Sequence, residues 1–179
     1  TYYAAGFAAQ REERIKQSLR HFEQAAGAYM KTSPPRRLRA ADARLRMGLI
    51  YSVVLEGEDE AERAFRAGLA LLDGHEQLAG APLMIGQLRQ QLIQLLDAQK
   101  KWGEVRDEAR ALIAWAEPRG DGAAVGRAHN FLASALLNLG DRAGAIAALE
   151  KGITALEGVD GEDALRKMMK ANLRALKKK

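Results

Sequence analysis

The three histidines are the side chains of this 179-residue sequence best suited to metal binding or acid–base chemistry. His21, His75 and His129 lie far apart in the sequence, and none belongs to an H-E-x-x-H motif or has carboxylates at metal-ligand spacing. Cysteine is absent, which excludes thiolate metal sites, cysteine nucleophiles and disulfides. We therefore expect ordinary surface or interhelix histidines and no metal site.

Glycine-rich and serine-based motifs would be needed to bind phosphates or to supply a nucleophile. Residues 120–126 are superficially similar to a dinucleotide-binding loop, but their glycine spacing is one residue too long and they follow Pro118 instead of a strand. No G-K-S or G-K-T loop occurs, and neither does a G-x-S-x-G or S-x-x-K motif. The sequence therefore predicts no catalytic residues, no cofactor and no enzymatic activity.

Three charged segments have both a binding interpretation and a structural one. The acidic residues 56–62 coincide with a predicted helix start, where Asp59 and Glu62 would form a capping box. The basic residues 36–39 could meet phosphates, but they lack interleaved aromatic residues and fit a solvated helix start. Residues 162–177 have an apolar stripe opposite a basic one, which suits a membrane surface, an acidic groove or a cap on a helical repeat; we favour the cap.

The composition is typical of a helix-rich protein, with 47% hydrophobic and 28% charged residues. The net charge of +5 is compatible with acidic peptides, nucleic acid or anionic membranes and selects none of them. No apolar run approaches the roughly 20 residues of a membrane-spanning helix, and no signal peptide is visible. We expect a soluble cytoplasmic protein, and the start at Thr1 without Met is consistent with a fragment of a larger protein or a processed start.

Proline and glycine divide the chain into blocks whose apolar residues recur at helical spacing. Ile15, Leu19, Phe22 and Ala26 follow steps of three and four, which is typical of one helix face. Gly-Asp pairs at 120–121 and 140–141 indicate a helix end followed by an aspartate that caps the next helix. We predict helices at residues 5–31, 38–55, 60–73, 83–99, 102–116, 122–139, 142–157 and 162–177.

Three units repeat the same residue types at the same spacing, with small residues that allow close helix packing. The third unit has Leu132, Ala133, Leu136, Ala145 and Leu149. The second unit has Leu92, Ile93, Leu96, Val105, Ala109 and Leu112. The first unit has Met47, Gly48, Tyr51, Ala61, Phe65 and Gly68.

This spacing resembles the tetratricopeptide repeat, whose pattern runs W-x2-L-G-x2-Y, then A-x3-F and Pro over about 34 residues. In the third unit His129 takes the place of the Trp. The equivalent residues Ala61, Val105 and Ala145 are 44 and 40 residues apart, so the units are longer than usual. Longer units of this kind are similar to the repeats in helical sensor domains of bacterial transcription activators and in kinesin light chains.

The resemblance implies an all-α fold, namely a right-handed α-solenoid of antiparallel helix pairs with about three and a half repeats. It forms a single domain over residues 1–179. The repeats are residues 38–80, 81–120 and 121–158; residues 1–37 are an N-terminal helix or partial repeat, and residues 159–179 a capping helix.

The resemblance also implies a binding groove, because the first helix of each tetratricopeptide pair lines the concave surface. The alignment maps this surface onto Gln87, Gln90, Gln94 and Asp97 in the second unit, and onto Arg127, Asn130, Ser134, Leu137 and Asn138 in the third. The first-unit positions are Asp42, Leu45, Leu49 and Ser52. Amide side chains both donate and accept hydrogen bonds, so such a row could hold an extended peptide; a merely solvated polar face is the alternative.

We therefore expect a protein-protein interaction scaffold that holds a peptide or helix of a partner protein without performing chemistry. One alternative is a nucleic-acid-binding helical repeat, suggested by the basic pI but disfavoured by the mostly neutral groove. Another is a ligand-sensing domain of a transcription activator, with a small molecule among the helices. No membrane insertion is expected, and the sequence gives no indication of an oligomeric state.

Overall fold

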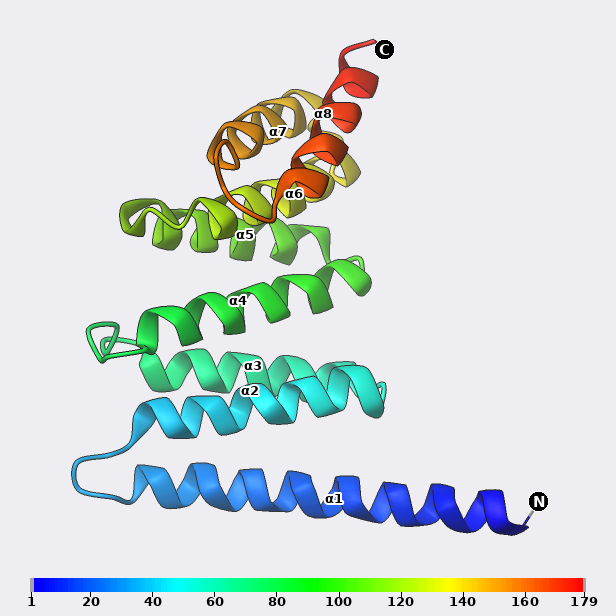
Figure 1. The fold of residues 1–179 in the computed structure, drawn as a ribbon, viewed down its shortest axis with the longest axis vertical. Coiled ribbons are helices and arrows are strands. Elements are labelled where there is room, and N and C mark those ends of the chain that lie inside the picture. The colour runs from blue at the N-terminus through cyan, green and yellow to red at the C-terminus, as the bar shows by residue number, and fades with distance from the viewer. Residues whose placement is uncertain (1, 179) are drawn as a thin grey trace. The chain divides into compact units, whose positions relative to one another are not determined.

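The computed structural model describes the backbone of residues 2–178 and the side chains of residues 11–178. Over this part of the chain every regular element is helical, as predicted, and each predicted range agrees with the observed one to within three residues (Figure 1). The helices are α1 (Tyr2–Met30), α2 (Arg37–Val54), α3 (Glu58–Leu72), α4 (Ala81–Ala98), α5 (Trp102–Ala116), the short 3-10 helix η1 (Glu117–Arg119), α6 (Gly122–Asn138), α7 (Arg142–Ala155) and α8 (Asp163–Lys177). None of the described helices is long and apolar enough to cross a membrane.

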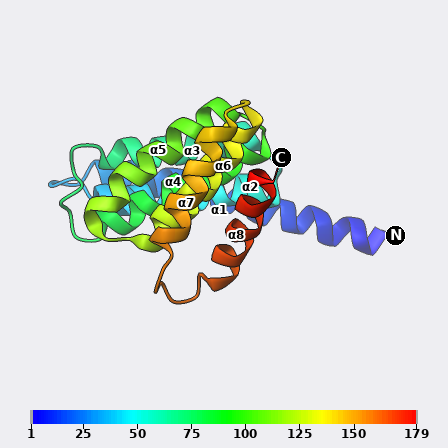
Figure 2. The same cartoon turned by 90° about the horizontal axis from the view of Figure 1, so that it is seen from above.

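The contacts divide the chain into two compact units, Thr1–Leu88 and Arg89–Lys179. Within each unit, helices that follow one another in the sequence pack side by side: α1 with α2 and α2 with α3, then α5 with α6, α6 with α7 and α7 with α8 (Figure 1). This sequential packing is consistent with a helical repeat. In the first unit, the N-terminal end of α1 extends beyond the ends of α2 and α3, as Figure 2 also shows.

The apolar stripe predicted on α1 forms one side of the core of the first unit. Leu19 is buried against Met47 of α2 and Ala64 of α3, and Phe22 packs on the same cluster. Ala26 is buried further along the same face of α1. The helical periodicity therefore predicted this buried face correctly.

Two aspartates cap the first turns of α6 and α7 in the second compact unit, as the sequence predicts. Asp121 accepts a hydrogen bond from the backbone N–H of Ala124 at 2.9 Å, and Asp141 accepts one from Gly144 at 2.7 Å. Each follows a glycine with positive φ, which ends the preceding helical segment. These caps fix the first residues of α6 and α7.

The predicted capping box at the start of α3 is wrong. Helix α3 begins at Glu58, so Asp59 lies inside its first turn instead of preceding it. Gly57 takes the N-cap position, which glycine tolerates, and no side chain caps this end. The acidic residues of the first turn still lie where the positive end of the helix dipole favours them.

Small residues allow successive helices to approach closely in both units. A Cβ atom added at Gly48 of α2 would overlap the ring of Phe65 on α3. A Cβ atom at Gly126 of α6 would likewise overlap Leu156, which follows α7. Since interiors are close-packed, these positions leave no room for a larger side chain.

We predict that Gly48→Ala lowers the free energy of unfolding by about 1–3 kcal/mol, because the added methyl group displaces the buried Phe65 ring. The matched control is Gly27→Ala in α1, where a Cβ atom meets nothing within 4 Å. There alanine stabilises the helix, by about 0.5–1 kcal/mol. Urea unfolding of both variants measures the effect, and an equal response of the two would contradict this packing.

Candidate functional site

Helix α6 carries the predicted binding residues of the third repeat unit along one face. Arg127, Asn130 and Ser134 follow steps of three and four and are half-buried, whereas Asn138 is exposed. Arg127 forms an ion pair with Glu162, with 3.0 Å between Nη1 and Oε1. Asn138 donates a hydrogen bond from Nδ2 to the backbone oxygen of Ser134 at 2.9 Å. Asn130 and Ser134 are therefore the members of this row most open to a partner.

A pocket of about 350 Å³ lies where α6, α7 and α8 meet, and we call it the groove pocket. Its polar lining comes from Asn130, Ser134 and Asn172, and the rest of its lining is apolar. The apolar members are Ala133, Leu137, Leu149, Ala175 and Leu176. Helix α8, expected only to cap the repeat, thus supplies one wall of the predicted binding surface.

Three contacts hold α8 against α7. Met169 is completely buried, and its methyl group lies against Gly152. The guanidinium of Arg142 donates to the backbone oxygen of Leu176. Lys177 pairs with Glu150, with 2.7 Å between Nζ and Oε1. These contacts fix the wall that carries Asn172 and Leu176.

The predicted binding residues of the second repeat unit do not line the groove pocket. Gln87 belongs to the compact unit that ends at Leu88, whereas Gln90, Gln94 and Asp97 belong to the same unit as α6. Gln94 is exposed and Gln90 is half-buried. Asp97 has a buried Oδ1 without a hydrogen-bond partner, and burial raises its pKa above the ordinary range.

The predicted binding positions of the first repeat unit lie on α2 and differ in their burial. Asp42 pairs with Arg46 of the same helix, with 2.9 Å between Oδ2 and Nε. Leu45 is buried in the core, so its prediction as an open binding residue is wrong. Leu49 and Ser52 are half-buried.

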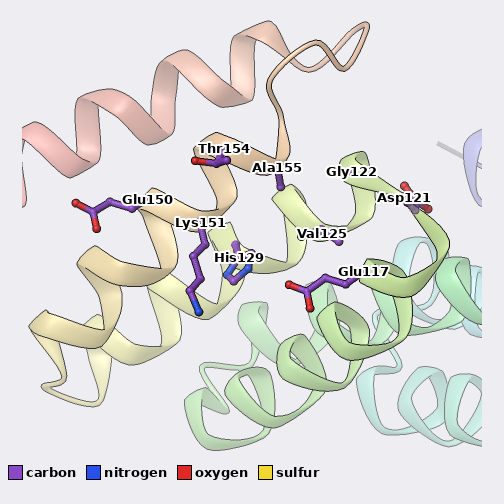
Figure 3. Close-up of a pocket in the computed structure, with 10 residues that line it drawn as sticks. Glu117, Asp121, Gly122, Val125, His129, Glu150, Lys151, Thr154 and Ala155 are labelled. Carbon is purple, nitrogen blue, oxygen red and sulfur yellow. The ribbon is translucent and has the colours of Figure 1, made fainter.

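A second pocket, of about 550 Å³, lies beside η1, the start of α6 and the end of α7. We call it the histidine pocket, because the imidazole of His129 forms part of its wall (Figure 3). The other lining residues are Glu117, Gly120, Asp121, Gly122, Val125, Glu150, Lys151, Thr154 and Ala155. It shares no lining residue with the groove pocket.

The imidazole of His129 is buried and poorly satisfied. The residue is 5% exposed, and its Nδ1 is enclosed without a hydrogen-bond partner. Burial lowers the pKa of His129 below its ordinary value of 6.5; Glu117 opposes this shift and Lys151 adds to it. His129 is therefore neutral at pH 7, and its burial agrees with the second of the two expectations, a surface or an interhelix histidine.

Sequence reasoning did not identify the residues that surround His129. Glu117 comes from η1 and Lys151 from α7, and neither belongs to a motif. Only the packing of α5 and α7 on α6 brings them to one site. The one local signal was the titratable side chain at position 129, where the repeat pattern that the sequence resembles has a tryptophan.

Comparisons with known proteins add no assignment. No protein-family model matches the sequence, and a search of curated proteins finds no match. Among the described residues, no group of three or more histidine, aspartate or glutamate side chains could hold a metal ion. The two pockets are therefore the candidate functional sites of the described residues.

We predict that the free energy of unfolding decreases when the pH is lowered from about 7.5 to about 5.5. The pKa of His129 is lowered in the folded state, so the unfolded chain takes up this proton first and is stabilised as the pH falls through the unfolded value. Urea unfolding at both pH values should show a smaller decrease in His129→Gln. The control His21→Gln, at an exposed position, should keep the full decrease; an unchanged decrease in His129→Gln would contradict this assignment.

Proposed function

We propose that this protein is an interaction scaffold that holds a peptide or helix of a partner protein in the groove pocket. The observation behind the proposal is the grouping of three hydrogen-bonding side chains, Asn130, Ser134 and Asn172, beside apolar walls in one pocket. This combination suits protein recognition, since amides bind a partner backbone while a recess accepts one of its side chains. No covalent chemistry is required.

We infer further that the repeat is of the tetratricopeptide type and forms a right-handed α-solenoid. The support is the burial of the residues that match the repeat pattern. In the first repeat unit Ala61 and Phe65 are 0% and 1% exposed, and in the third repeat unit Ala145 and Leu149 are 0% and 3% exposed. Burial of these small and large residues in the core is what the repeat pattern requires.

The charge of α8 favours an acidic partner segment. The exposed residues Lys167, Lys170 and Arg174 lie on the helix that carries Asn172. Their charges would attract acidic side chains that flank the bound segment and would speed its association. Lowering the ionic strength should therefore strengthen binding.

Photocrosslinking at two leucines of similar exposure tests the proposal. Leu137 lines the groove pocket and is 46% exposed, whereas Leu139 is 47% exposed and does not line it. With p-benzoyl-L-phenylalanine at position 137, we expect a discrete protein adduct in native lysate treated with nuclease. Position 139 should give no such adduct, and equal labelling from both positions would contradict a binding site in the pocket.

Matched amide substitutions show whether the adduct depends on the pocket. We expect Asn130→Asp and Asn172→Asp each to reduce the adduct from position 137 at least about tenfold, because a carboxylate repels an acidic partner and cannot donate a hydrogen bond. The control Asn138→Asp makes the same change outside the pocket and should leave the adduct unchanged. If nuclease treatment removes the adduct, the site binds nucleic acid instead.

A further inference from the structure

Three side chains that line the histidine pocket lack a hydrogen-bond or ion-pair partner among the described residues, and they differ in charge. Glu117 and Lys151 form no ion pair or side-chain hydrogen bond among the described residues, and His129 forms no hydrogen bond there. The remaining charged lining residues are engaged elsewhere. Asp121 caps α6 at 2.9 Å, and Glu150 pairs with Lys177 at 2.7 Å. One carboxylate, one ammonium and one imidazole are therefore available to a ligand.

The imidazole of His129 forms part of the pocket wall, and of its two nitrogens only Nδ1 is enclosed without a partner. An enclosed N–H group would be costlier at Nδ1 than an enclosed lone pair. We therefore assign the proton of the neutral ring to Nε2. Since Nδ1 is closed off, Nε2–H is the group of His129 that remains for a ligand.

Glu117 and Lys151 flank this imidazole from different elements. Figure 3 shows the carboxylate of Glu117 pointing toward the ring from η1, and the side chain of Lys151 extending alongside the ring from α7. Both charges also act on the protonation of His129, in opposite senses: Glu117 raises its pKa and Lys151 lowers it. A ligand at the imidazole would thus meet a positive charge on one side and a negative charge on the other.

The remaining lining residues are small or apolar, apart from Thr154. Val125 and Ala155 supply methyl groups, and Gly122 lies so close to the end of α7 that an added Cβ atom would be 2.7 Å from the backbone oxygen of Ala155. The pocket volume of about 550 Å³ falls within the range of ligand pockets, roughly 300–1,000 Å³. The site therefore has room for an apolar group next to the three polar ones.

We propose that the histidine pocket binds a free α-amino acid with a large apolar side chain. The ligand carboxylate accepts hydrogen bonds from Lys151 Nζ and His129 Nε2, and the ligand ammonium pairs with Glu117. The ligand side chain covers Val125 and Ala155. A zwitterion whose ammonium and carboxylate groups are attached to the same carbon can satisfy all three available groups at once. This proposal does not depend on the groove pocket.

An NMR titration with L-phenylalanine and two analogues tests the proposal. The probes are L-phenylalanine, 3-phenylpropanoate, which lacks the ammonium, and 2-phenylethylamine, which lacks the carboxylate. We expect saturable shifts of the His129 imidazole and Val125 methyl signals with L-phenylalanine, and at least about tenfold weaker binding of each analogue. Absence of saturable shifts with L-phenylalanine overturns the proposal, and so does equal binding of either analogue.

Charge-neutralising variants test the assignment of the two charged contacts. Lys151→Gln and Glu117→Gln change exposed side chains, so the fold is expected to persist. Each should weaken L-phenylalanine binding at least about tenfold. The controls Lys170→Gln and Glu157→Gln remove the same charges at exposed positions that do not line the pocket, and should bind as the unaltered protein does. Equal affinity of the pocket variants and the controls overturns the proposal.

Discussion

The structure of the second compact unit depends on one constraint: successive helices approach closely at small residues. Gly126 admits Leu156 against α6, and Gly152 admits the methyl group of Met169 against α7. Because α7 lies so near to α6, side chains of α6 reach two separate sites. Asn130 contributes to the groove pocket with α8, and His129 contributes to the histidine pocket with η1 and the end of α7.

Much of the fold was predictable because helix signals are local. The spacing of apolar residues on α1 and the aspartates that cap α6 and α7 act within a few residues, and all were identified correctly. The start of α3 was not identified correctly. Gly57 and Asp59 are both acceptable N-cap residues, and the local sequence does not show which of them precedes the helix. Helix packing within each unit followed from chain order, as short connections make successive helices neighbours.

The candidate sites were less predictable because they combine residues from separate elements. Alignment to the repeat pattern placed Asn130 and Ser134 correctly on one face of α6, but it did not predict that Asn172 of α8 would join them. The histidine pocket depends on where η1 and α7 end relative to α6, which periodicity does not determine. Burial also separated Leu45, a core residue, from Asp42, Leu49 and Ser52, the other binding positions predicted on α2.

The most direct test of this account is a methyl NOESY spectrum of the protein labelled with ¹³C at the methionine methyl groups. The account predicts cross-peaks from the Met169 methyl group to the Hα protons of Gly152 and the Hβ protons of His129, since both lie where that methyl group packs. The neighbouring Met168, which is 45% exposed, should show neither. Absence of the Met169 cross-peaks, or their appearance from Met168, would contradict the packing of α8 on α6 and α7 that forms the groove pocket.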